Sequence, residues 1–420
     1  MVYEDITTLL GGWEGFALVG VVRTPAEAPA PPSIELTLEP VPGLVRRCGR
    51  CGDAVAEVHD VVPRRIRDLP ILDADTWLIL PRARVRCPRC GPTVEAVPWL
   101  DRYQRMTVRF AESIARLAQV LPIDHVATQL RIGWQTVKAI DRRALAQRLG
   151  PLDVSTVRII AVDEFALHRG HRYATVVVEV PTKRVLWVSR ERDRAALDGF
   201  FTALGPAGCA RLEAVVMDLW RPYLEAVRTH CPATAIVYDL FHLLTRYSRD
   251  VVDRVRVDET NRLQHAPQRH EPLRDQVVAR RRVIKGTRWL LLKNPTRLGR
   301  TERIRLRELL AANRALFIVY VLKDDLKRLW RFRYPGAARR WWRSWYRRAL
   351  ASRLPPLIQF ARRLRASIEY IVNHCRYPLH TGLLEGINNK IKVLKRMAYG
   401  YRDDDYFFLK IRAAFPGIPR

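Results

Sequence analysis

Residues 158–180 read RIIAVDEFALHRGHRYATVVVEV, and this stretch decides the class of fold. An apolar, strand-like run ends in two adjacent carboxylates, Asp163 and Glu164, and a second run begins near residue 173. The pattern continues with predicted strands at 184–189, 213–218 and 234–238 and helices near 193–204 and 222–230. Such alternation is typical of a mixed α/β layer. An acid at the end of a buried strand is unfavourable unless it is paired or bound to metal, so Asp163 is a candidate functional residue.

The charge of the chain indicates the kind of partner. Its 420 residues include 73 Lys and Arg against 43 Asp and Glu, which gives a net charge of +30. A surplus of this size favours a polyanionic partner, because basic side chains displace counterions from phosphates. The longest apolar run, ALFIVYVL at 315–322, is too short to span a membrane. The N-terminus has no early Lys or Arg and is a poor signal peptide, so we expect a cytoplasmic, nucleoid-associated protein.

Two further acids stand at comparable places. Asp218 ends the predicted strand in LEAVVMDLWRPY (212–223), and Glu385 lies in the predicted helix HTGLLEGINNKIKVLKR (380–396). Together with Asp163 they can hold two divalent cations about 3.5–4 Å apart, as in enzymes that break phosphodiester bonds by in-line attack. Mg²⁺ suits carboxylate and phosphate oxygens, with Mn²⁺ as an alternative ion. Taken singly, each acid could instead end a strand in a turn or cap a helix.

Two basic side chains follow Glu385 on the same predicted helix. Lys392 lies seven residues further on, two turns along the same face, with Asn388 and Asn389 between them. We expect Lys392 to contact a DNA phosphate while Glu385 binds metal, and Arg396 is a further candidate DNA contact. The alternative is an ordinary pair of surface residues.

The cysteines form a predicted zinc site. Two Cys-x2-Cys knuckles are separated by 35 residues and comprise Cys48, Cys51, Cys87 and Cys90. Each knuckle directs two thiolates to one point, and two knuckles complete a tetrahedral site that suits structural zinc. Four free thiols and an iron site are the alternatives. The odd total of seven cysteines argues against a disulfide framework.

A helix-turn-helix is predicted at residues 124–143, DHVATQLRIGWQTVKAIDRR. Asp124 is the expected N-cap, the first helix ends at Leu130 and the turn covers 131–133. The residues expected to face DNA from the second helix are Gln135, Thr136 and Lys138. A plain helical spacer would show a similar pattern.

Residues 331–370 are unusually basic, with eleven arginines and a single acid, Glu369. The aromatic residues among them are Trp341, Trp342, Trp345 and Tyr346. Arginines can pair with phosphates and aromatic rings can stack on unpaired bases. Alternatively, the tryptophans form the core of a helical bundle whose arginines face solvent.

Long stretches of this chain resemble the ISL-three family of bacterial insertion-sequence DDE transposases. The matching stretches are CGRCG, HDVVPRRIRDLPI, RVRCPRCG, VDEFALHRGHRYATVVVE, MDLWRPYLEAVRTHCPATAIVYDLFHLL, RWLLLKNP (288–295) and LEGINNKIKVLKRMAYGYR (384–402). The resemblance implies an RNase H-like fold, a helical insertion, and Asp163, Asp218 and Glu385 as the catalytic, Mg²⁺-binding acids. The Glu-x6-Lys spacing is also widespread in DDE transposases.

The segment YDLFH (238–242) contains two further candidate site residues, Asp239 and His242. Related transposases carry a Cys-or-Asp-x-x-His pair here, so Asp239 is an alternative to Asp218 as the second acid. Asp218 is preferred because it ends the strand where an RNase H-like sheet places its second acid. Asp239 and His242 are expected to brace the site, and Glu164, on the opposite strand face, to be structural.

The expected fold is α/β: an RNase H-like mixed sheet with a large all-helical insertion, preceded by a small zinc-ribbon-like module and a helix-turn-helix domain. The predicted parts are an arm and Pro-rich linker (1–44), the zinc module (45–100), the helix-turn-helix (101–150), the catalytic domain (151–240 and 372–420) and the basic insertion (241–371).

The expected function is that of a DNA transposase. The zinc module and the helix-turn-helix domain, here called the front modules, would bind terminal inverted repeats. The catalytic domain would hydrolyse a phosphodiester at each end and join the freed 3′-hydroxyl to target double-stranded DNA. Pairing two ends predicts at least a homodimer, with no membrane association. The alternatives are a non-catalytic DNA-binding regulator derived from a transposase and a general structure-specific nuclease.

Overall fold

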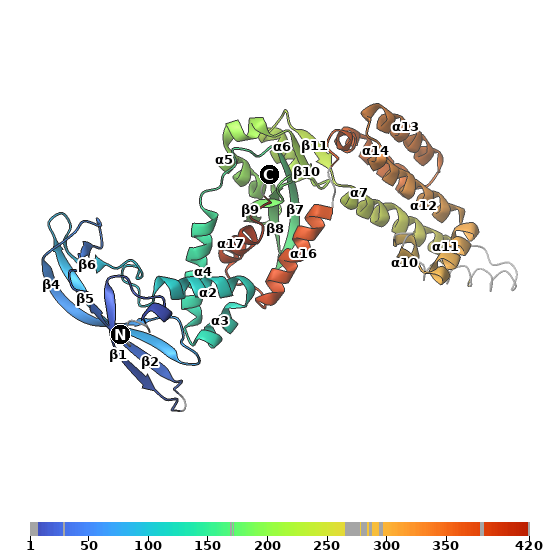
Figure 1. The fold of residues 1–420 in the computed structure, drawn as a ribbon. Helices are drawn as coiled ribbons and strands as arrows, with labels where there is room; N and C mark the ends of the chain where they lie inside the picture. The colour runs from blue at the N-terminus through green and yellow to red at the C-terminus, as the bar shows by residue number, and fades with distance from the viewer. Residues whose placement is uncertain are drawn as a thin grey trace. The chain divides into compact units, whose positions relative to one another are not determined.

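The computed structural model describes residues 7–27, 30–168, 170, 172–264, 278, 284, 288–293, 297–378 and 382–418 (Figure 1). Parts of the predicted insertion, including the end of RWLLLKNP, lie outside these residues. The chain forms two compact units, one of Met1–Gly150 with Lys395–Leu409 and one of Pro151–Leu394 with Lys410–Arg420. The segment Lys395–Leu409 therefore packs with the front modules, whereas the sequence places all of 372–420 in the catalytic domain.

The first unit contains a β-sheet whose strands run in the order β1-β2-β5-β6-β3, with β4 paired to β5. Its strands are β1 (Phe16–Thr24), β2 (Ser33–Pro40), β3 (Arg47–Cys48), β4 (Val58–Arg67), β5 (Asp75–Cys87) and β6 (Gly91–Ala96). The predicted arm and linker (1–44) is wrong where β1 and β2 lie, because β2 pairs with β1 and β5. Leu36 and Leu38 alternate with polar residues and are buried in the core, and this alternation outweighs the flanking prolines.

Three helices follow the sheet: α2 (Val108–Val120), α3 (Ile123–Leu130) and α4 (Trp134–Leu149). Phe110, Val126 and Val137, one from each helix, are fully buried and join them in a single core. The predicted turn between α3 and α4 is present, with Arg131 in the left-handed region at φ 52°. The N-cap of α3 is Pro122 rather than the predicted Asp124, which lies in the first helical turn.

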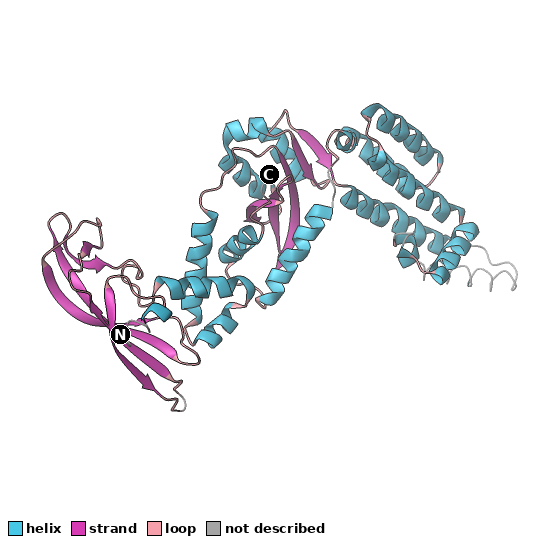
Figure 2. Ribbon diagram, in the orientation of Figure 1, coloured by secondary structure: helices cyan, strands magenta, loops and turns pink. Residues whose placement is uncertain are grey.

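The second unit is built on a mixed sheet, whose strands are magenta and whose neighbouring helices are cyan in Figure 2. Its strand order is β11-β10-β7-β8-β9. Its strands are β7 (Ile159–His168), β8 (Arg172–Glu179), β9 (Arg184–Arg190), β10 (Ala214–Met217) and β11 (Ala235–Tyr238). β7, β8 and β9 are antiparallel neighbours, while β10 and β11 run parallel to β7. Helices α5 (Arg194–Arg211) and α6 (Arg221–His230) connect the later strands. This topology is RNase H-like, as predicted.

One detail of the central strand differs from the prediction. β7 does not end at Asp163 but continues to His168, because its second half pairs with β8. The parallel neighbour β10 pairs with β7 only as far as Ala161. Asp163 therefore lies inside β7, at the level where the adjacent parallel strand ends.

A helical insertion follows β11. Its elements are α7 (Leu240–Tyr247), the π-helical η1 (Ser248–Asp253), α8 (Arg254–Gln264), α10 (Arg288–Leu292), α11 (Arg300–Ala312), α12 (Arg314–Lys327), η3 (Arg328–Arg331), α13 (Pro335–Ala351), α14 (Pro355–Arg365), α15 (Ile368–Val372) and η4 (Asn373–Cys375). Trp345 is fully buried and its Nε1 donates to the carbonyl of Leu322 at 2.8 Å. Trp342 is also buried, so these two rings belong to the core, as the bundle alternative predicts.

The chain ends with α16 (Gly382–Met397) and α17 (Asp404–Ala414). Ile387 and Ile391 bury one face of α16, whereas Glu385 and Lys392 are exposed. Within the described residues, no helix combines the length and the apolar character required to cross a membrane.

Candidate active site and metal centre

Three carboxylates lie in one row across the parallel strands of the second unit. Val216 of β10 pairs with Ala161 of β7, so the same register two residues further on sets Asp218 beside Asp163. Met217 pairs with Tyr238 of β11, and one further residue sets Asp239 beside Asp218. Neighbouring strands lie about 4.8 Å apart, and residues in one row share a face of the sheet. The sheet therefore gathers three acids that are up to 76 residues apart in sequence.

His242 lies between the first two of these acids. Its Nε2 is 3.6 Å from Oδ1 of Asp163, and its Nδ1 is 3.4 Å from Oδ2 of Asp218. The ring is carried by the first turn of α7, whose N-cap is Asp239. The buried carboxylate of Asp239 accepts a hydrogen bond from the backbone N–H of Phe241 at 2.6 Å. Asp239 thus starts the helix that positions His242.

The site concentrates negative charge. Asp163 is 7% exposed. Burial raises its pKa to about 6, and the nearby carboxylates of Glu164 and Asp239 act in the same direction. Burial also raises the pKa of Asp239, with a further contribution from Asp218.

Arginine does not neutralise this cluster, although the chain is rich in it. Among the described residues, the ion pairs of Asp163 and Asp218 are with His242 alone. The neighbouring Glu164, by contrast, forms an ion pair with Arg192 at 3.0 Å. Carboxylates without an arginine partner are ligands of the chemical type that divalent cations take, but the ligand atoms of Asp163, Asp218 and His242 do not all lie within 4.8 Å of one another.

Helix α16 is attached to the first acid through an asparagine. The Nδ2 of Asn388 donates to Oδ2 of Asp163 at 2.8 Å and to the carbonyl of Glu164 at 3.4 Å. The buried Oδ1 of Asn388 has no hydrogen-bond partner. The sequence pattern had indicated no role for Asn388, although an amide one turn after Glu385, on a similar helix face, was an available signal.

Glu385 is placed near this site but not within a compact cluster. The ligand atoms of Asp163, Asp218 and Glu385 do not all lie within 4.8 Å of one another; of the described residues, the group that meets this criterion is the four cysteines. Glu385 is exposed, one turn before Asn388. The structure therefore brings two predicted acids together and carries the third on the helix attached to them.

The four predicted zinc ligands meet in the first unit. The Sγ atoms of Cys48, Cys51, Cys87 and Cys90 all lie within 4.8 Å of one another. Cys48 ends β3, while Cys87 and Cys90 lie at the turn between β5 and β6. Zinc–sulfur bonds of about 2.3 Å in a tetrahedron require sulfur atoms about 3.8 Å apart, and Cys51 and Cys87 are 3.6 Å apart. A hydrogen bond from the backbone of Cys51 is the largest influence on Cys48, whose pKa is lowered to about 6. The arrangement fits structural zinc.

The predicted DNA-facing residues of α4 differ in accessibility. Gln135 and Thr136 are exposed. Lys138 is less accessible, because its Nζ is 2.8 Å from Oδ2 of Asp403 and its side chain is 20% exposed. Asp403 precedes α17 and belongs to the same compact unit. Lys138 therefore braces α4 against the C-terminal segment, a contact that local sequence does not reveal.

The RNase H-like sheet with its row of acids defines the class: a DDE-type enzyme that processes DNA. A family model described as "Transposase", for the ISL3 DDE domain, matches residues 160–411. A helix-turn-helix domain of transposase family ISL3 matches 95–145, and a zinc-finger of transposase IS204/IS1001/IS1096/IS1165 matches 45–90. The chain belongs to the ISL3 family of DDE transposases, which the sequence resemblance had indicated.

Two relatives are similar over most of the chain. The transposase for insertion sequence element IS1001 of Bordetella parapertussis is 45% identical over 423 residues, covering 100% of both chains. The transposase for insertion sequence element IS1557 of Mycobacterium tuberculosis is 31% identical over 383 residues, covering 87% of this chain and 84% of the relative. The IS1001 transposase therefore aligns with the front modules of this chain as well as with its DDE domain.

The raised pKa of Asp163 predicts a cost to stability. Because the folded state binds this proton more tightly than the unfolded state, stability falls as pH rises from about 4 to about 6. The difference between about 6 and the ordinary value of 3.8 corresponds to about 3 kcal/mol. Asp163→Asn should therefore raise the unfolding free energy by up to about 3 kcal/mol at pH 7.5 in Mg²⁺-free buffer, measured by urea denaturation, and by little at pH 4.

A matched control is Glu225→Gln, which removes an acid paired with Arg221 on the surface of α6. Exposed pairs of this kind contribute about 0.5 kcal/mol or less. The cost of burying the charged carboxylate of Asp163 would be contradicted by an equal gain in stability in both variants. A gain for Asp163→Asn that does not depend on pH would also contradict it.

Proposed function

We propose that this transposase cuts and joins DNA at the terminal inverted repeats of its own insertion sequence, with Asp163, Asp218 and Glu385 as the catalytic acids. The row of carboxylates beside the central strand is the observation that carries this proposal. Asp218 is preferred to Asp239 because its carboxylate is 28% exposed and faces His242. Asp239 is buried and engaged as the N-cap of α7, which suits a bracing role.

The metal in this proposal is Mg²⁺, with Mn²⁺ as a substitute. Asp163 and Asp218 would hold it, and Glu385 would complete the donor set from α16. When bound, it would supply Lewis-acid activation of the attacking and leaving oxygens at a phosphodiester. The protein's own part is to align its acids through the strand register, to hold His242 at their edge through α7, and to orient Asp163 through Asn388.

DNA recognition is assigned to the first unit and to α16. Gln135 and Thr136 are exposed at the start of α4, where a recognition helix meets base edges. Lys392 and Arg396 are exposed on α16 and would contact phosphates. Because two ends must be processed together, the active species is proposed to be at least a homodimer on DNA.

A supercoiled-plasmid assay tests the proposal. The plasmid carries the element's two terminal repeats, and a second plasmid serves as target DNA. We expect Mg²⁺-dependent strand cleavage at both repeat ends and joined products with the target plasmid, detected by gel electrophoresis and sequencing of the junctions.

A plasmid with scrambled repeats of the same length is the control and should remain uncut. Binding to the repeats without cleavage in either Mg²⁺ or Mn²⁺ would identify a non-catalytic regulator instead. Equal cutting of the scrambled plasmid would identify a structure-specific nuclease.

A further inference from the structure

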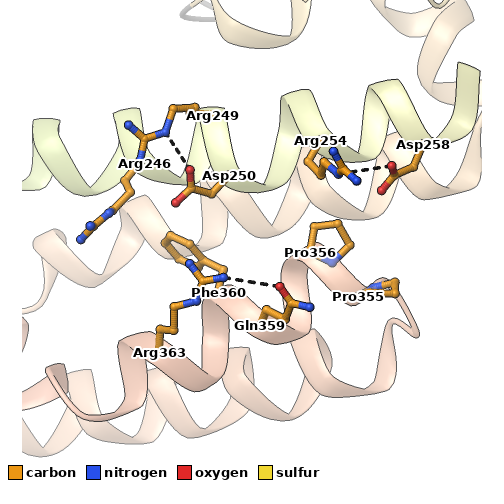
Figure 3. A pocket seen from close by; sticks show the side chains of 10 residues that line it. All are labelled: Arg246, Arg249, Asp250, Arg254, Asp258, Pro355, Pro356, Gln359, Phe360 and Arg363. Carbon is orange, nitrogen blue, oxygen red and sulfur yellow. Dashed lines mark hydrogen bonds and ion pairs between the residues drawn. The ribbon is translucent and has the colours of Figure 1, made fainter.

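A groove lined by arginines lies between the first helices of the insertion and α14 (Figure 3). Its volume is about 650 Å³. One wall is formed by α7, η1 and α8, and the other by the first turns of α14 with Pro355 and Pro356 at its start. The charged side chains along it are Arg246, Arg249, Asp250, Arg254, Asp258 and Arg363.

The groove keeps unneutralised positive charge. Asp250 pairs with Arg249 at 2.7 Å, and Asp258 pairs with Arg254 at 3.4 Å. Arg246 instead donates to the carbonyl of Leu219 at 3.3 Å. Arg363 donates to the side-chain oxygen of Gln359 at 3.4 Å. Both have neutral partners here and are exposed, so the groove carries two cationic groups in excess.

One end of the groove, at Arg246, lies close to the candidate active site. Arg246 lies one helical turn after His242 on α7. Its partner Leu219 directly follows Asp218. The pKa of Arg249 is raised, mainly by its hydrogen bond to Asp250, and Asp218 adds to this effect. Helix α7 and the adjoining η1 thus carry both His242, which lies between Asp163 and Asp218, and the first arginines of the groove.

The length of this path matches several phosphates. From His242 to Arg254 the helical rise is about 18 Å, at about 1.5 Å per residue. One strand of B-form DNA advances 3.4 Å per phosphate, so this length corresponds to about five phosphates. The path includes the π-helical η1, a rare conformation that occurs frequently at functional sites. A row of guanidinium groups over this length suits a chain of phosphates better than a single small anion.

We propose that this groove binds the phosphate backbone of one DNA strand as it leaves the active site, within about five nucleotides of the cleaved phosphodiester. This inference rests on the proposed cleavage function. Arg246 and Arg363, whose partners in the groove are uncharged, pair with phosphates from the two walls. The groove thereby holds the cut end in place between cleavage and joining.

The test uses full-length protein and a duplex that ends at the cleaved terminus of the element's repeat. Neutral methylphosphonates replace the five terminal phosphates of one strand, then of the other. Wild-type protein should lose about tenfold in affinity when the bound strand is neutralised. The double variant R246Q/R363Q should bind the unmodified duplex about tenfold more weakly, lose nothing further on neutralisation, and show a salt slope lower by about 1.8, at about 0.9 per phosphate.

The control variant R305Q/R314Q removes two exposed arginines of the same insertion that do not line this groove. It should keep the wild-type response to methylphosphonates, and circular dichroism should show that both variants fold. Full sensitivity to neutralisation in R246Q/R363Q would overturn the groove's role while leaving the cleavage function intact. Failure of wild-type protein to cleave the repeats in the plasmid assay would overturn both.

Discussion

Asp163→Asn is expected to abolish cleavage at the repeat ends, with a loss of at least about 10³-fold, because removing one charged ligand from the proposed two-metal site would cost several kcal/mol of transition-state stabilisation. Binding to the terminal repeats should persist, since the first unit is untouched. Asp163 lies inside β7 and pairs with Val176, so an isosteric amide should leave the strand intact. The measurement is single-turnover cleavage of the repeat plasmid, alongside a gel-shift assay of binding.

Neighbouring carboxylates supply the controls. Glu164→Gln changes the next residue of the same strand, whose partner is Arg192, and should reduce cleavage far less. Asp218→Asn should be as severe as the change at Asp163. Asp239→Asn should retain measurable cleavage, because asparagine is also a good N-cap for α7. An inactive Asp239→Asn beside an active Asp218→Asn would transfer the role of second acid to Asp239.

Cys87→Ser is expected to unfold the zinc-bearing part of the first unit. Cys87 joins β5 to β6 and is buried beside Val85 and Ala83. Binding of structural zinc supplies about 10–16 kcal/mol in small zinc modules, which exceeds the stability of a typical domain. Zinc content measured by mass spectrometry should fall from about one ion per chain to near zero. Limited proteolysis should then cut between residues 45 and 100, and binding to the terminal repeats should be lost.

Cys375→Ser is the matched control, because Cys375 lies in η4 of the second unit, outside the cysteine cluster. It should keep one zinc ion and the wild-type proteolysis pattern. Stoichiometric zinc in Cys87→Ser would show that Cys87 is not a ligand.

Local patterns predicted much of the second unit. Strands expected at 184–189 and 234–238 are β9 (Arg184–Arg190) and β11 (Ala235–Tyr238). Short apolar runs bounded by turn residues have few alternatives in a layered α/β domain, which explains this agreement. The four cysteines were also predicted correctly as one cluster, because ligand spacing within each knuckle is a local property.

Other expectations failed where distant contacts decide the outcome. Prolines suggested a linker within residues 1–44, but β2 is held in the sheet by β1 on one side and β5 on the other. The sequence also contained no sign that Lys138 pairs with Asp403, from a segment 265 residues further along the chain. Asp163 was expected at a strand end, but β8 extends β7 beyond it.

The sequence by itself determined the class of fold and the zinc knuckles, because hydrophobic periodicity and ligand spacing are read within a few residues. Only the tertiary structure decided that Asp163, Asp218 and Asp239 form one row, that His242 lies against the first two, and that Asn388 attaches the helix of Glu385 to Asp163. Strand register and helix docking arise from the packing of segments far apart in the chain. The site therefore exists only when that packing is complete.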